Sequence, residues 1–234
     1  MNIRRLYSDV MDYYRREGVS EILYRGSHRV YESIAPLEFR VKLRKNIYNI
    51  YGYDLPSDPL SPINIDPSDI KYCTPYRFKP VKRHIGRVKD GEWDQHEKQR
   101  VEEGTTFVGL RERFVDELPW EETIYYQHLE GAVSNGELLK GCENKKDIKT
   151  RCEYLDNLYN HMKSHGYSAH RNLTPPERIK RSHHDTTPEE ITVNIDRNGN
   201  PLLQDGHHRL SLAKILDIDS IPVISIVYHK QSVK

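Results

Sequence analysis

The fold is decided by a segment near the end of the chain, Glu190-Ile-Thr-Val-Asn-Ile-Asp-Arg-Asn-Gly-Asn-Pro-Leu-Leu-Gln-Asp-Gly-His-His-Arg-Leu-Ser-Leu-Ala-Lys-Ile-Leu-Asp-Ile-Asp-Ser-Ile-Pro-Val-Ile-Ser-Ile-Val-Tyr228. Residues 191–195 are rich in β-branched side chains and alternate along the chain, and residues 196–200 contain the Asn-Gly pair of a tight turn. Residues 201–204 then return as a second strand. This pattern predicts a β-hairpin.

A helix and a last strand follow the hairpin. Asp205-Gly206 ends the second strand, and residues 207–216 place Leu212, Ile215 and Leu216 on one face of a helix. Residues 221–228 are strongly apolar, as a buried strand is. The order strand, hairpin, strand, helix, strand predicts an α/β domain.

Composition favours one domain with an appendage, or two small domains. The 234 residues are 36% hydrophobic and 30% charged, and 36 Lys and Arg against 35 Asp and Glu give a net charge of +1. This balance argues against a protein whose whole surface coats nucleic acid. No apolar run approaches ~18 residues and the start lacks the apolar block of a signal peptide, so we expect no transmembrane segment and a cytoplasmic location.

The three cysteines, Cys73, Cys142 and Cys152, are odd in number and form no close pair. We therefore expect reduced thiols rather than a disulfide framework or a zinc site.

Residues 1–60 predict a basic, tyrosine-rich helical arm followed by a linker. The first fifty residues carry ten Lys and Arg against six Asp and Glu, and one helical stripe of apolar side chains is spaced i, i+3, i+4, i+7, i+8, i+11: Ile3, Leu6, Tyr7, Val10, Met11 and Tyr14. That stripe needs a partner, which is the domain core, a second subunit, or an anionic surface such as a membrane or RNA. Three prolines in residues 54–62 mark the linker.

The main domain is expected over residues 61–234. It opens with a short strand at 63–65 that stops at Asp66-Pro67, and a basic stretch, 71–89, comes before an acidic one. Residues 89–149 predict helices, one capped by Thr105 or Thr106 and another from Pro119 through Tyr126. A further helix opens at Asp147 or Thr150 and ends at Gly166.

The turn Asp205-Gly206-His207-His208-Arg209 carries the candidate chemistry. It lies where a strand ends and a helix starts, and the free N–H groups and positive dipole of a helix N-terminus hold anions. Gly206 lets the backbone approach a ligand, Arg209 can fork onto phosphate oxygens, and both histidines can donate hydrogen bonds. The alternative is structural: Asp205 caps the helix and the histidines face solvent.

The string from Leu202 to Lys214, followed by Ile221-Pro222-Val223, resembles the closing motif of the ParB/sulfiredoxin superfamily. The stretches 63–70 and 155–166 are similar to its earlier elements, so that residues 89–149 would be a helical insertion and residues 1–60 an N-terminal helical extension. The resemblance implies a small mixed sheet whose glycine-basic turn, Gly206 to Arg209, binds nucleotide phosphates.

Members of this superfamily differ in activity. Sulfiredoxins place a reactive cysteine immediately before the His-Arg pair, where this chain has His207, which removes the nucleophile of sulfinic-acid repair. Chromosome-partition ParB proteins continue into a helix-turn-helix region, whereas this chain ends six residues after Tyr228. Free-serine kinases of the superfamily share the Asp-Gly-basic-His-Arg type of turn, which implies phosphoryl transfer from ATP or ADP, with CTP as a further candidate, to a small hydroxyl compound.

Phosphoryl transfer needs a phosphate cradle, a magnesium ligand and a base. We expect the cradle at residues 206–209 and Mg²⁺ at Asp205, with Asp205, His207, His208 and Glu190 as the catalytic set. Other carboxylates that could serve as the base are Glu189, Asp69 and Asp94.

Two further motifs have both a functional and a structural interpretation. Trp93, between two acidic residues, lines the acceptor side of the pocket or packs the insertion onto the core. His183-His184-Asp185 binds a metal or is a polar loop. Two other functions compete with the enzyme: a ParB-like, nucleotide-switched nucleic-acid module or nuclease acting through the arm and residues 71–89, and a scaffold without catalysis.

Overall fold

The computed structural model describes residues 36–79, 81–167 and 190–234. The chain divides into two compact units, Met1–Leu43 and Arg44–Lys234. Helix α2 spans Leu37–Ile50. The site and fold below concern Arg44–Lys234. The apolar stripe at residues 3–14, the His183-His184-Asp185 motif and Glu189 lie outside the described residues.

A six-stranded mixed sheet forms the centre of the second unit, in the order β1-β6-β4-β5-β2 with β3 also paired to β6. Its strands are β1 (Ile63–Ile65), β2 (Tyr72–Cys73), β3 (Arg87–Lys89), β4 (Ile191–Ile195), β5 (Pro201–Asp205) and β6 (Ile221–His229). The chain is therefore mixed α/β, as the pattern of its last segment predicts. The short strand at residues 63–65 is confirmed as well.

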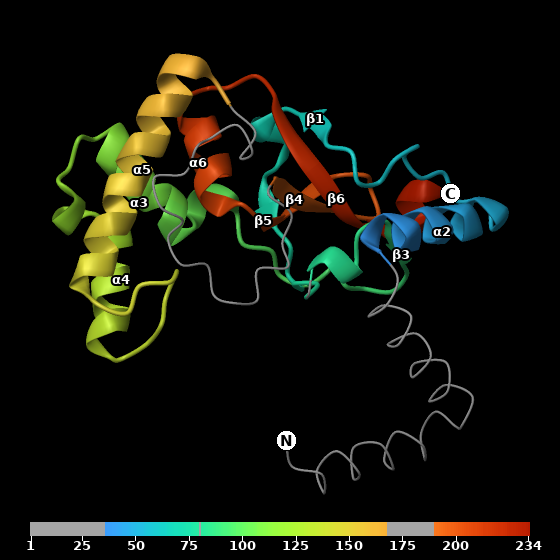
Figure 1. Cartoon of the computed structure of the whole chain (residues 1–234), viewed down its shortest axis with the longest axis horizontal. Helices are drawn as coiled ribbons and strands as arrows, with labels where there is room; N and C mark the ends of the chain where they lie inside the picture. Colours follow the sequence, from blue (N-terminus) through green and yellow to red (C-terminus); the bar gives the residue numbers. More distant parts are fainter. Residues whose placement is uncertain (1–35, 80, 168–189) are drawn as a thin grey trace, which may run out of the picture. The chain divides into compact units, whose positions relative to one another are not determined.

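Strand β6 is the longest strand and has partners on both edges (Figure 1). β4 runs parallel along one edge, and β1 and β3 pair with the two ends of the other edge. Residues on both faces of β6 are buried, which is why its sequence is mostly apolar, apart from Ser225 and His229, instead of alternating.

The predicted hairpin joins β4 to β5. Asp196 Oδ1 accepts the backbone N–H groups of Asn198 and Asn200 at 2.9 and 2.8 Å, and Gly199 takes a φ of +85°. An aspartate that closes the turn and a glycine in the left-handed region fix the register of the two strands.

Helices cover one side of the sheet (Figure 1). They are α3 (Thr105–Phe114), α4 (Ile124–Ser134), α5 (Lys145–His165) and α6 (His207–Ile215). Leu210, Leu212 and Ala213 of α6 are fully buried in a core shared with the sheet and with α3, α4 and α5. Residues 89–149 thus contain α3, α4 and the start of α5, and whether they are an insertion stays a prediction.

The helix boundaries differ from the predicted ones in three places. Gly104, not a threonine, is the N-cap of α3, and α5 begins at Lys145 because Asn144 accepts the N–H of Asp147. Pro119 precedes a 3₁₀ turn at 120–122, and Thr123 then caps a separate helix, α4. The C-terminal end of α5 at Gly166, with φ +72°, is as predicted.

The proline-rich segment packs on the domain. Leu55 is buried with Tyr228 and Val233, and the N–H of Asp54 donates to Val233 O at 2.8 Å. Cys73, Cys142 and Cys152 are free thiols, which agrees with the prediction. None of the helices within the described ranges has the length and apolarity needed to cross a membrane.

Candidate anion-binding site

The candidate site lies where β5 and β2 end. β2 runs parallel to β5, with Cys73 beside Leu203, so the loop after β2 and the start of α6 after β5 lie at the same edge of the sheet. The crevice outside the carboxyl ends of strands is a common place for ligands in α/β folds.

A buried amide network fixes the loop after β2. The side-chain amide of Asn194 donates to Thr74 Oγ1 and to Gln204 Oε1, both at 2.9 Å, and Gln204 exchanges two 3.4 Å hydrogen bonds with the backbone of Phe78. Asn194 Oδ1 also accepts the N–H of Val227 where the register of β4 against β6 shifts. The loop from Thr74 to Phe78 is therefore held at both ends, and Arg77 within it is directed toward α6.

Gly206 is required by packing. Its φ is +99°, and an added Cβ would lie 2.8 Å from Cγ1 and 3.1 Å from Cα of Ile191. The side of Gly206 that would carry a Cβ is therefore packed against Ile191 of strand β4. Gly206 is the N-cap of α6 and gives no side-chain cap, and Asp205 Oδ1 accepts the N–H of Gly206 at 2.8 Å instead of capping the helix.

His207 is the first residue of α6 and faces the loop after β2. Its Nε2 lies 3.5 Å from a guanidinium nitrogen of Arg77 and 3.8 Å from Cys73 Sγ. Because a guanidinium only donates, Nε2 is the acceptor. Burial, together with the charges of Lys140 and Arg77, lowers the pKa of His207 to about 4, against the opposing effect of Asp205. His207 is therefore neutral at pH 7.

His208 turns to the opposite side, toward α4 and α5. Its Nε2 lies 2.7 Å from the hydroxyl of Tyr125, and Arg151 of α5 donates to that hydroxyl. Burial raises the pKa of Tyr125, and burial with nearby cations lowers that of His208, so a neutral hydroxyl donates to a neutral imidazole. Neither histidine is directed to solvent, which contradicts the structural alternative.

Positive charge accumulates around the start of α6. Burial of its amine, followed by the charges of Arg77 and Arg151, lowers the pKa of Lys140, although the residue as a whole is exposed. Lys140 belongs to the loop between α4 and α5, and Arg151 binds the Lys140 carbonyl oxygen. Cations from three separate elements therefore lie close enough to repel one another.

Negative charge there is sparse. Asp205 is the carboxylate whose charge opposes these cations at both Lys140 and His207. Glu102, which acts on Cys73, is engaged with Lys214 at 2.6 Å. Asp147 acts on Cys142 beside Arg151. Within the described part of the chain, the three cations Arg77, Lys140 and Arg151 therefore outnumber the carboxylates Asp205 and Asp147.

Arg209 and Glu190 form an ion pair. Arg209 Nη1 lies 3.7 Å from Glu190 Oε2 and 3.3 Å from the hydroxyl of Tyr167, and the two charged side chains are only 11% and 7% exposed. Burial, partly offset by Arg209, raises the pKa of Tyr167 to about 12, which keeps its hydroxyl protonated. Arg209 is thus partly committed to the protein, and its predicted fork onto phosphate stays a prediction, as does the role of Glu190 as a base.

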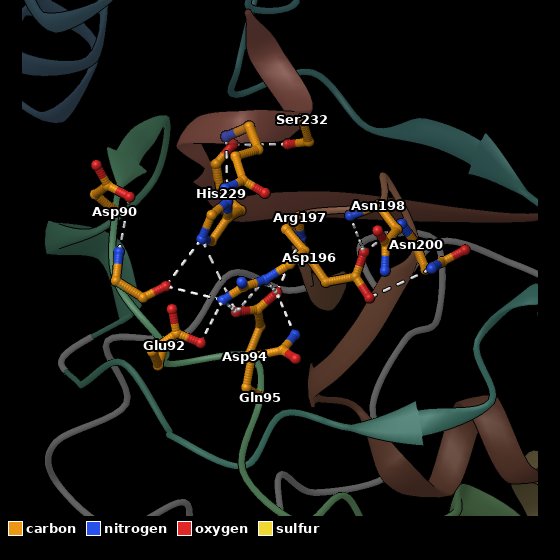
Figure 2. Close-up of polar contacts among 12 residues, drawn as sticks. Asp90, Glu92, Asp94, Gln95, Asp196, Arg197, Asn198, Asn200, His229 and Ser232 are labelled. Carbon is orange, nitrogen blue, oxygen red and sulfur yellow. Dashed lines mark hydrogen bonds and ion pairs between the residues drawn. The ribbon is translucent and has the colours of Figure 1, made fainter.

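Asp94 does not belong to this site, which corrects its interpretation as a candidate base. Asp94 is fully buried and receives Arg197 Nη2 at 2.8 Å and Arg197 Nε at 3.0 Å, beside the hairpin turn at the far end of β5 (Figure 2). Five strand residues span about 16 Å, so Asp94 is out of reach of a ligand at α6. Trp93 packs edge-on to Phe78 and against His229, as the packing interpretation has it.

We call this cluster, Glu92, Asp94, Arg197 and His229, the hairpin clamp. Burial alone would raise the pKa of Asp94, but the hydrogen bonds from Arg197 outweigh it and hold that pKa far below its ordinary value. Arg197 also binds Gly91 O and Glu92, and His229 donates to Gly91 O at 3.0 Å. Asp69 is exposed in the 3₁₀ turn at 67–69, away from these contacts.

Sequence reasoning placed Asp205 to Arg209 at the site but missed three basic residues. Arg77 is 130 residues from His207, and Lys140 and Arg151 lie in a segment interpreted as an insertion. The signal that could have drawn attention to Lys140 is its place before Gly141, a pair typical of a tight turn.

Comparison with known proteins gives no relative: no family model matches the chain, and no curated protein or solved structure matches it.

Proposed function

We propose that this chain is a ParB/sulfiredoxin-like nucleotide-binding protein that uses ATP or ADP, or CTP, and Mg²⁺ to transfer a phosphoryl group to a small hydroxyl compound. The support is the excess of cations at the N-terminus of α6: Arg77, Lys140 and Arg151 against Asp205. Cations that repel one another favour an anion bound among them, because its charge offsets the repulsion.

The donors suit a phosphate. The first intrahelical bond of α6 is Leu210 N–H to Gly206 O, so the N–H groups of residues 207–209 have no partner within the helix. Arg77 adds a planar pair of donors from the facing loop. The phosphate would lie between this helix end and the guanidinium.

Magnesium fits this site only together with phosphates. Asp205 Oδ2 has no hydrogen-bond partner among the described residues, whereas Oδ1 accepts Gly206 N–H. Mg²⁺ is commonly held by one or two carboxylates plus substrate phosphates, which matches a single aspartate. The ion would neutralise charge on the transferred group.

Two groups can take the proton of an acceptor hydroxyl. His207 is neutral and can accept a proton at Nε2 once Arg77 releases that nitrogen, and Asp205 is the carboxylate next to it in the chain. Glu190 would first have to give up its ion pair with Arg209. His207 or Asp205 is therefore the better candidate for the base.

Incubation with Mg·ATP or Mg·ADP and a panel of small alcohols, including amino acids with hydroxyl groups, tests the proposal. Phosphorus NMR should show a new phosphomonoester formed in step with AMP or ADP. Tight nucleotide binding with no ester from any acceptor would contradict the transferase, and absence of nucleotide binding would contradict the whole proposal.

The nucleic-acid alternative is favoured by one surface. Tyr76 is 57% exposed, and Arg77, Lys79, Lys82 and Arg83 beside it are exposed as well. Basic side chains with an aromatic ring are typical of single-strand binding. A steep fall of DNA or RNA affinity with salt would support this alternative.

A further inference from the structure

A cysteine and a histidine from distant parts of the chain meet at the carboxyl end of β2. Cys73 is the last residue of β2, and its Sγ lies 3.8 Å from Nε2 of His207, the first residue of α6. A thiol is a weak donor, and its large sulfur atom makes such contacts longer than those of an oxygen. Both residues are half-buried, so neither is closed off from solvent.

The tautomer of His207 suits a base for this thiol. Arg77 Nη2 lies 3.5 Å from the same Nε2, and because a guanidinium can only donate, the lone pair of Nε2 is the acceptor. The proton of the neutral ring is therefore on Nδ1. The S–H group of Cys73 thus lies beside a nitrogen that can accept its proton, which is the arrangement in which a histidine activates a nucleophile.

The Cys73 thiol needs such a base. Burial raises its pKa, against the opposing effect of the Arg77 charge, so little thiolate is present at pH 7. The thiolate is the form that attacks electrophiles. Cys142 and Cys152 are only 0% and 4% exposed, so Cys73 is the thiol of the three that a reagent in solution can reach.

Arg77 links the pair to negative charge. It is exposed, and its 3.5 Å contact with Nε2 is long for a hydrogen bond. A carboxylate or phosphate oxygen is a stronger partner for a guanidinium than a neutral imidazole is. An anionic group bound by Arg77 would therefore release Nε2 to accept the thiol proton, and it would lie close to the sulfur.

We propose that Cys73 and His207 form a nucleophile–base pair, and that Cys73 is a site of covalent modification by small electrophiles that carry a negative charge. His207 Nε2 takes the S–H proton as Sγ forms a bond to the electrophilic carbon, and the leaving group departs with the electron pair of its broken bond. The proton then passes from His207 to water. This inference goes beyond the proposed phosphoryl transfer and does not depend on nucleotide binding.

Alkylation of the folded protein at pH 7 by iodoacetate, which is anionic, and by the neutral iodoacetamide tests the proposal. Peptide mass spectrometry gives the rate at each cysteine. The ratio of the iodoacetate rate to the iodoacetamide rate at Cys73 should be about tenfold higher in the folded protein than in the urea-unfolded chain, because a nearby cation attracts the carboxylate. Cys142 and Cys152 should stay unmodified in the folded protein.

Variants separate the two roles. Arg77→Gln should abolish the preference for iodoacetate, whereas Lys79→Gln, at an exposed lysine of the same loop, is the matched control and should keep it. His207→Gln should slow both reagents at least about tenfold, because the base is lost. His207→Asn replaces it if that protein does not fold. A purely structural effect would instead open the fold, speed both reactions and expose Cys142 and Cys152.

A ratio at Cys73 equal to that of the unfolded chain, or a preference kept in Arg77→Gln, would overturn the inference. Unchanged or faster alkylation in the His207 variants would overturn it as well. None of these measurements contains a nucleotide, so their failure leaves the proposed function standing. Conversely, a protein that binds no nucleotide can still show the selective alkylation of Cys73.

Discussion

The two ends of strand β5 carry polar clusters of opposite construction. At the Gly199 end, the hairpin clamp matches Arg197 with Asp94 and Glu92 at 2.8 and 3.0 Å (Figure 2). At the Gly206 end, Arg77, Lys140 and Arg151 come from three elements, and the carboxylate that opposes them at Lys140, Asp205, accepts a backbone N–H instead of pairing with a described cation. The first arrangement is complete within the protein. In the second, cations outnumber carboxylates among the described residues, which is the imbalance that an anion-binding site requires.

This difference indicates what each cluster does. Charges that are buried and fully hydrogen-bonded hold segments together, and removal of one partner leaves an uncompensated charge in the interior. Like charges that lie close together reduce the stability of the free protein, and they are typical of functional sites, where a bound ligand of opposite charge offsets the repulsion. Substitutions at the clamp should therefore lower stability, and substitutions among the cations should lower affinity.

The largest effect is expected for Asp94→Asn in the clamp. Loss of the buried carboxylate leaves Arg197 without its main partner and should lower the free energy of unfolding by about 3–5 kcal/mol, measured by urea denaturation. Glu92→Gln, at a carboxylate 72% exposed, is the control and should cost less than about 1 kcal/mol. Equal losses of stability in the two variants would show that the buried Asp94–Arg197 pair does not hold the hairpin in place.

Acid should weaken the same clamp. The pKa of Asp94 is lowered in the folded protein, so its contribution to stability is complete above its unfolded pKa of about 4 and is lost as the pH falls below that value. The wild-type protein should therefore lose stability below about pH 4 more steeply than Asp94→Asn does. Parallel pH profiles of the two proteins would contradict this assignment.

Arg209→Ala should cost about 3 kcal/mol of stability, because it leaves Glu190 buried and without this cation. Sequence alone predicts instead a loss of nucleotide affinity with little change in folding. The double variant Arg209→Ala/Glu190→Gln separates the two effects. It should recover much of the stability, and any affinity still missing then belongs to Arg209 itself.

The two glycines at the ends of β5 form a matched pair. Gly206→Ala combines a left-handed backbone with a clash against Ile191 and should cost about 2–3 kcal/mol, measured by thermal or urea unfolding. Gly199 has φ +85° but open space around it, so Gly199→Ala should cost only about 1 kcal/mol. The reverse order would mean that Gly206 is not held against β4.

The smallest effect on folding is expected at Arg77. Arg77→Gln should weaken nucleotide binding by about 1–3 kcal/mol in calorimetry and leave unfolding nearly unchanged, because this exposed guanidinium repels its neighbours in the free protein. Lys79→Gln, two residues along the same loop, should leave affinity almost unaltered. Similar losses for both would point to a diffuse basic surface instead of a site.

Local patterns predicted the part of the fold that is local. The hairpin, α6 and β6 were predictable since each is marked by its own signals, such as Asn198-Gly199 and the apolar run of β6. The predicted helix starts were less accurate, because a helix cap depends on contacts with residues two or three positions away, as at Asn144 and Thr123. The order of strands in the mixed sheet could not be predicted in this way, because β2 pairs with β5, which lies more than a hundred residues further along the chain.

The site was predicted only where it is continuous in the chain. Residues 205–209 form one turn, whereas Arg77 reaches His207 through strand pairing and Lys140 through a turn held by Arg151. The pairing of Arg209 with Glu190 was also invisible, because the chain between β4 and α6 folds back on itself. Single-sequence patterns do not encode such distant contacts.

A crystal structure of the protein with Mg·ADP tests the central claim most directly. We expect phosphate oxygens within hydrogen-bond distance of the N–H groups of residues 207–209 and of Arg77. ADP bound at another surface, with the start of α6 in contact only with protein or water, would contradict the account.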